Sequence, residues 1–78
     1  MRTRQLKLIV TFHTTTSAMS LEKICIEKGI PGRLIPVPRE ITAGCGMSWC
    51  APVDARSIIE TTAKEAVIET DGWYELMV

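Results

Sequence analysis

The stretch Leu6-Lys-Leu-Ile-Val-Thr-Phe-His13 decides the fold class of this chain. Its residues alternate in character, and four apolar side chains share one face of the extended segment: Leu6, Leu8, Val10 and Phe12. Such alternation is typical of a β-strand that has one face against a core. Segment 6–13 is therefore predicted to be a strand.

A helix is predicted directly after this strand. The run from Thr14 to Thr16 supplies N-cap candidates, because threonine hydroxyls accept hydrogen bonds from free amides at a helix start. Gly29 suits the end of the helix, and Pro31-Gly32 forbids its continuation. We expect the helix to run to about Lys28, with an inward stripe at three- and four-residue spacing made of Ala18, Leu21, Ile24, Cys25 and Lys28.

The rest of the chain predicts two further strands, a helix and a last strand. Segment 33–38 is predicted to be an edge strand, because its prolines cannot donate to a sheet ladder. Segment 47–51 is a short third strand. Pro52 and Asp54 then indicate a helix start with Asp54 as N-cap. We expect its buried stripe to hold Ile58, Ile59, Thr62, Ala63, Ala66 and Val67. After a turn at 71–72, segment 73–78 closes the chain as a fourth strand.

The order β-α-β-β-α-β predicts a ferredoxin-like α+β fold. Both helices are expected on one face of a four-stranded antiparallel sheet, with the strands in the spatial order four, one, three, two. No linker composition interrupts the chain, so we expect a single domain over residues 1–78.

Composition and charge exclude several classes of function. The net charge is zero, but residues 1–39 hold seven basic against two acidic residues, and residues 40–78 hold two against seven. The basic residues are neither dense nor interleaved with aromatics, which argues against a nucleic-acid partner. No apolar run approaches the roughly 20 residues that span a bilayer, so no membrane association is expected. The apolar run after the basic N-terminus is too short for a signal peptide, and an odd count of three cysteines fits reduced thiols. The expected location is the cytoplasm.

A candidate reactive thiol lies in the segment 36–46, which reads Pro-Val-Pro-Arg-Glu-Ile-Thr-Ala-Gly-Cys-Gly. Cys45 stands between Gly44 and Gly46, downstream of Arg39 and Glu40. Glycines on both sides remove side-chain cover, and a reactive cysteine needs exposure. The topology places the loop between strands two and three at the end of the sheet where the first strand ends. We therefore expect Cys45 near His13 and the amino end of the first helix.

The predicted roles at this site follow from the chemistry of a thiolate. Positive charge and free amides favour the nucleophilic thiolate, so Arg39, His13 and the amides around Gly44 and Gly46 are candidate partners of the Cys45 sulfur. His13 is equally interpretable as a strand-end residue, and Arg39 and Glu40 as a mutual ion pair. The alternative to a reactive thiol is that Cys45 is only a small residue tolerated in a tight turn.

The other two cysteines have separate interpretations. Cys50 is either a core residue or a resolving thiol for Cys45, although the spacing differs from the Cys-x-x-Cys of thioredoxin-like sites. Cys25 lies on the apolar stripe of the first helix and is expected to be a buried hydrophobe. A zinc site from Cys45, Cys50 and His13 lacks the paired ligand spacing of structural zinc sites. We expect no metal and no cofactor.

The run from Thr11 to Gly46 resembles a family of small bacterial proteins described as selenium/sulfur (Se/S) carrier protein-like, also labelled a domain of unknown function. The resemblance rests on the strand residues 9–12, the helix with Ala18 and Leu21-Glu-Lys23, the string Pro38-Arg-Glu-Ile41, and Cys45-Gly46. It implies that the chain moves sulfur or selenium as a persulfide or selenosulfide on Cys45, between donor and acceptor proteins. The Cys-Pro-x-Pro motif of well-studied sulfur carriers is absent.

Three functions remain open from the sequence. The first is the Se/S carrier. The second is a non-catalytic interaction or regulatory module, a homodimer for example, that uses a bare sheet face with Ile9 and one tryptophan on it. The third is a thiol-disulfide protein using Cys45 and Cys50. A turnover enzyme is not expected, because the chain offers no acid/base pair and no phosphate-binding glycine loop.

Overall fold

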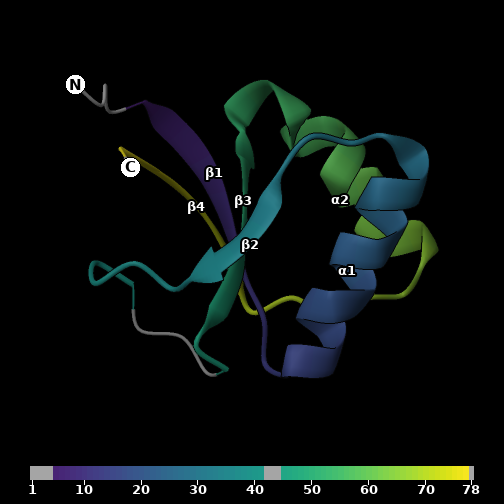
Figure 1. Ribbon diagram of the computed structural model, residues 1–78, viewed down its shortest axis with the longest axis horizontal. Coiled ribbons are helices and arrows are strands. Elements are labelled where there is room, and N and C mark those ends of the chain that lie inside the picture. Colours follow the sequence, from purple (N-terminus) through teal and green to yellow (C-terminus); the bar gives the residue numbers. More distant parts are fainter. Residues whose placement is uncertain (1–4, 42–44, 78) are drawn as a thin grey trace.

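The computed structural model describes residues 5–41 and 45–77 (Figure 1). The elements follow the order β1 (Leu6–Thr11), α1 (Thr15–Lys28), β2 (Arg33–Pro36), β3 (Met47–Pro52), a 3-10 turn η1 (Val53–Ala55), α2 (Arg56–Glu65) and β4 (Gly72–Met77). The predicted β-α-β-β-α-β order is confirmed.

The four strands form one antiparallel sheet in the order β2-β3-β1-β4. This is the predicted order, and it places β1 at the centre with β3 on one side and β4 on the other. Figure 1 shows α1 and α2 together on one side of the sheet. The chain therefore has the ferredoxin-like α+β fold. No helix among the described residues combines the length and the apolar character that crossing a membrane requires.

The main core lies between the sheet and the helices. The alternating face of β1 supplies Leu8, Val10 and, just beyond the strand, Phe12, all fully buried. Because directly paired residues share a face, Ala51 and Trp49 of β3, opposite Leu8 and Val10, face the helices too. The helices contribute small and medium side chains to this core: Ala18, Leu21, Cys25, Ile59 and Ala63.

The start and end of α1 agree with the prediction. Thr14 is the N-cap, and its hydroxyl oxygen accepts a hydrogen bond from the Ser17 amide at 3.2 Å. Gly29 follows the helix in the left-handed conformation, with φ 71°. The predicted inward position of Lys28 is wrong, because Lys28 is exposed and its ammonium lies 3.7 Å from the Glu65 carboxylate.

The second helix differs from the prediction at both ends. Asp54 is not its N-cap: Asp54 lies in η1, and α2 begins after Ala55, which makes no side-chain cap. The helix ends at Glu65, so the predicted burial of Ala66 and Val67 is wrong. Val67 is 88% exposed, with a left-handed φ of 55°. Ile58 is also exposed, since a ten-residue helix buries only the narrow stripe Ile59, Thr62 and Ala63.

Candidate functional site

Cys45 lies two residues before β3, at the end of the sheet where β1 ends and α1 begins. Thr11, the last residue of β1, pairs with Ser48 near the start of β3, which brings these two ends together (Figure 1). The connection from β2 to β3 is closed at its base, where the Val37 amide donates to the Gly46 carbonyl at 3.0 Å. The thiol therefore sits at the foot of a closed loop.

The Cys45 side chain is half-buried and packs against the helix-side core. Its thiol donates a hydrogen bond to the Met47 carbonyl at 3.5 Å. Beside it, Gly46 has φ 80°, which favours glycine, and a Cβ built there would meet no atom within 4 Å. The Cys45 sulfur is thus held by one hydrogen bond, and the space beside the neighbouring Gly46 is unoccupied.

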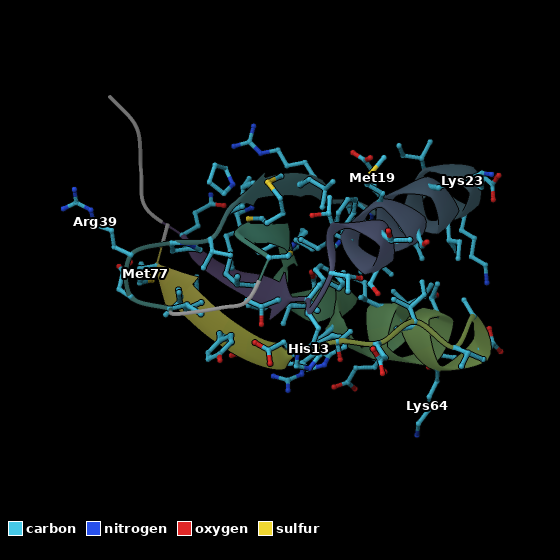
Figure 2. All side chains as sticks on the ribbon, turned by 90° about the horizontal axis from the view of Figure 1, so that it is seen from below. His13, Met19, Lys23, Arg39, Lys64 and Met77 are labelled. Atoms are coloured by element: carbon cyan, nitrogen blue, oxygen red, sulfur yellow. The ribbon has the colours of Figure 1, made fainter. Side chains whose placement is uncertain are left out.

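Arg39 and Glu40 form the tip of a turn, closed by a hydrogen bond from the Ile41 amide to the Pro38 carbonyl at 3.0 Å. Both side chains are exposed, and Figure 2 shows Arg39 extending away from the body of the molecule. Among the described residues, no hydrogen bond or ion pair joins either side chain to the other or to the Cys45 sulfur. Gly44, also predicted for this site, lies outside the described residues.

His13 contacts an acidic residue rather than the thiol. Its Nε2 atom lies 3.5 Å from the Asp71 carboxylate, and the Asp71 amide donates to the Thr11 carbonyl at 2.7 Å. Asp71 precedes β4, which flanks β1 on the side opposite β3. The structure therefore places His13 and Cys45 at the same end of the sheet but gives them no contact.

The structure also separates the three cysteines, all of which are free thiols. Cys50 pairs with Ile9 and Arg33, so it faces away from the helices, whereas Cys45 packs on the helix side. A disulfide requires Cα atoms about 4.4–6.8 Å apart, and Met47 to Cys50 alone spans roughly 10 Å of strand. Cys45 and Cys50 are therefore not brought together in this fold.

Cys25 is fully buried in the core, as predicted. Burial raises the pKa of the Cys25 thiol above its ordinary value, and the nearby Lys28 ammonium opposes this shift. Because a raised pKa keeps the sulfur protonated, Cys25 is a packing residue. No group of three or more His, Cys, Asp or Glu side chains within residues 5–41 and 45–77 is arranged to hold a metal ion.

The sheet face away from the helices is not bare. Ile9, Thr11 and Ser48 lie on it and are all fully buried. Figure 1 shows segment 37–41 on this side of the sheet, and Ile41, 7% exposed, lies outside the helix-side core. The apolar patch expected from Ile9 and a tryptophan is wrong, because Ile9 is covered and Trp49 and Trp73 both pair with Val10 on the helix side.

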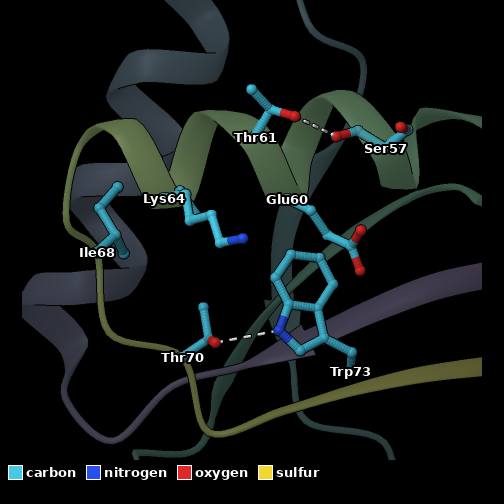
Figure 3. A pocket seen from close by; sticks show the side chains of 8 residues that line it. Ser57, Glu60, Thr61, Lys64, Ile68, Thr70 and Trp73 are labelled. Atoms are coloured by element: carbon cyan, nitrogen blue, oxygen red, sulfur yellow. Dashed lines mark hydrogen bonds between the residues drawn. The ribbon is translucent and has the colours of Figure 1, made fainter.

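Two cavities lie apart from Cys45. One, of about 480 Å³, lies between α2 and β4, where Lys64 reaches toward the Trp73 ring (Figure 3). There the indole N–H donates to the Thr70 hydroxyl at 3.1 Å. The Arg56 guanidinium lies 5.9 Å from the centre of the same ring and contacts Glu75 at 2.9 Å. These contacts fix the indole as one wall of the cavity.

The other cavity, of about 570 Å³, is lined by Cys50 together with Lys7 and Arg33. These two basic residues are functional candidates that the sequence alone did not indicate. The alternation of the strands contained the necessary signal, because it shows which residues of each strand share a face. Lys7, Arg33 and Cys50 meet on one face once the register of the three strands is known.

A family model described as "Putative Se/S carrier protein-like" matches residues 7–75, nearly the whole chain. Neither the curated proteins nor the solved structures include one that matches the chain. The family match covers β1 to β4, including the loop that carries Cys45. The chain therefore belongs to this Se/S carrier protein-like family.

Proposed function

We propose that this protein carries sulfur or selenium on Cys45, as a persulfide or selenosulfide, from a donor protein to an acceptor enzyme. Family membership supports the type of cargo. The observation that carries the proposal is the position of Cys45, a free thiol at the foot of a closed loop, held by Met47 and flanked by the open Gly46.

The transfer step balances without an added oxidant. The Cys45 thiol gives up its hydrogen bond to the Met47 carbonyl and loses its proton to solvent. The resulting thiolate attacks the terminal sulfur of a donor persulfide, so that a new sulfur–sulfur bond forms on Cys45 and the donor leaves as a thiolate. A nucleophile on the acceptor then takes the terminal sulfur and releases the Cys45 thiolate.

Delivery to a partner protein agrees with the surroundings of the loop. Arg39 and Glu40 are exposed at its tip, where a docking protein can reach them. We propose that they contact the donor or acceptor, and that the protein acts in the cytoplasm, where reducing conditions keep thiols free.

Intact-mass spectrometry tests the carrier role. The protein is incubated with a cysteine desulfurase and cysteine, and the mass gain is measured. In a second reaction the mixed disulfide of Cys45 with 2-mercaptoethanol is incubated with selenide, which forms a selenosulfide on Cys45 as 2-mercaptoethanol leaves. We expect an adduct of one sulfur or selenium atom on the wild type and on Cys50→Ser, and its loss in Cys45→Ser. The buried Cys25→Ala serves as a further control that keeps the adduct. An adduct that persists in Cys45→Ser would refute the proposal.

A further inference from the structure

A groove that contains Cys50 runs over the sheet face away from the helices. Its volume of about 570 Å³ falls within the usual range of ligand sites. Residues from three neighbouring strands on that face line it: Lys7, Arg33, Ile35, Cys50 and Pro52. The groove thus combines a thiol, apolar walls and two cationic side chains.

The register of the sheet places the two cations on either side of the thiol. Arg33 on β2 is the direct partner of Cys50, and Lys7 on β1 is the partner of Pro52, the next residue of β3 on the same face. Directly opposed side chains have Cβ atoms about 5 Å apart, and diagonal neighbours lie roughly 7–8 Å apart. Both cations are therefore within reach of a small molecule bound at the Cys50 sulfur.

These two cations have no acidic partner in the part of the chain that the structure describes. None of its ion pairs involves Lys7 or Arg33, and the groove is lined by no aspartate or glutamate. The ion pairs of the described residues lie at α2 and at the turn that contains Asp71, away from the groove. The groove consequently attracts anions, and its thiol adds a reaction partner that a plain anion site lacks.

We propose that this groove binds small anionic disulfides, compounds of the form R–S–S–R whose R groups carry carboxylates, and that Cys50 forms a mixed disulfide with them. The Cys50 thiolate attacks one sulfur of the compound. A Cys50–S–S–R bond forms, the original S–S bond breaks, and RS⁻ leaves and takes up the proton lost by Cys50. The carboxylate of the retained R group is held by Arg33 and Lys7.

This site goes beyond the proposed carrier function, because Cys50 and Cys45 face opposite sides of the sheet. A mixed disulfide on Cys50 would occupy part of the groove and reduce its two uncompensated positive charges to a net charge of one. It would not touch the helix-side surface on which Cys45 packs.

Three disulfides of similar size and different charge test the proposal: 3,3′-dithiodipropionate (anionic), 2-hydroxyethyl disulfide (neutral) and cystamine (cationic). The rate of modification of Cys50 is measured by peptide mass mapping in Cys45→Ser, and each rate is divided by that of N-acetylcysteinamide. Because Cys45 is replaced in this background, the result does not depend on the proposed carrier function. We expect the anionic compound to react fastest and the cationic one slowest. Each step in charge, from anionic to neutral and from neutral to cationic, should lower the relative rate by roughly fivefold.

Charge variants show whether Lys7 and Arg33 cause the preference. Arg33→Glu and Lys7→Glu should each reverse part of it, Arg33→Lys should keep it, and the same reversal at the exposed Lys23 on α1 should leave it unchanged. Added salt should weaken the preference, since these charges are near the surface. If a charge reversal prevents folding, the salt dependence of the three relative rates in Cys45→Ser alone decides the question. Equal relative rates for all three compounds, or no reaction at Cys50, would overturn the proposal.

Discussion

At the scale of single residues, Gly32 is the position where one added carbon matters most. It has φ 143°, and a Cβ there would lie 2.6 Å from atoms of the buried Trp49 indole. Such an overlap must displace the ring or the backbone, which costs typically a few kcal/mol in a packed core. We expect Gly32→Ala to lower the free energy of unfolding by about 3 kcal/mol, measured by urea denaturation.

Gly46→Ala is the matched control for this substitution. Gly46 also has a positive φ, of 80°, but a Cβ there meets no atom within 4 Å. The alanine is penalised only by its unfavourable backbone conformation, so we expect the free energy of unfolding to fall by about 1 kcal/mol. Equal losses at the two positions would show that the indole contact is not what requires a glycine at position 32.

At the scale of elements, α1 and α2 end in the same way with different residues. After each helix a left-handed residue donates its N–H to the carbonyl three residues back, and the next N–H bonds five residues back. The two distances are 3.3 and 2.8 Å at Gly29, and 3.2 and 2.9 Å at Val67. This is the Schellman motif, in which glycine is favoured because a Cβ crowds the following carbonyl.

Exchanging the residue types at these two ends should therefore have opposite effects. Val67→Gly removes strain from an exposed β-branched side chain, and we expect the free energy of unfolding to rise by about 1 kcal/mol. Gly29→Val should lower it by about as much, since no atom lies within 4 Å of the added Cβ and only the backbone conformation is penalised. Thermal and urea unfolding measure both changes. A loss of stability in Val67→Gly would contradict this account.

At the scale of the whole molecule, the two faces of the sheet are covered by different means and to different extents. Helices cover one face, and segment 37–41 lies on the side of the other, with Ile41 buried there. We expect Ile41→Ala to lower the free energy of unfolding by roughly 2–3 kcal/mol, the usual cost of emptying a buried isoleucine site. The same substitution at Ile26, 70% exposed on α1, should change it by less than about 0.5 kcal/mol. Equal effects in urea denaturation would show that Ile41 does not cover the sheet.

The sequence by itself determined the features that depend on local patterns. Alternation in segment 6–13 sets one strand face, and the threonines at 14–16 and Gly29 mark the ends of α1, because caps act on neighbouring amides and carbonyls. The family resemblance, now shown by the match over residues 7–75, also rests on local motifs. The order of elements then restricts the sheet to a few topologies, and the ferredoxin-like arrangement is one of them.

Only the tertiary structure decided the ends of α2 and the surroundings of the thiols. Asp54 lies inside a 3-10 turn that has no side-chain cap, so its preference for a cap position did not set the start of α2. Val67 is held in a left-handed turn that its own preference opposes. Arg39, His13 and Cys45 are close in topology, yet the three side chains diverge. His13 contacts Asp71, Cys45 donates to the Met47 carbonyl, and Arg39 extends away from the body of the molecule. Lys7, Arg33 and Cys50 are far apart in sequence and meet through strand register. Local patterns record backbone preferences, whereas side-chain direction at the ends and faces of elements is set by what packs there.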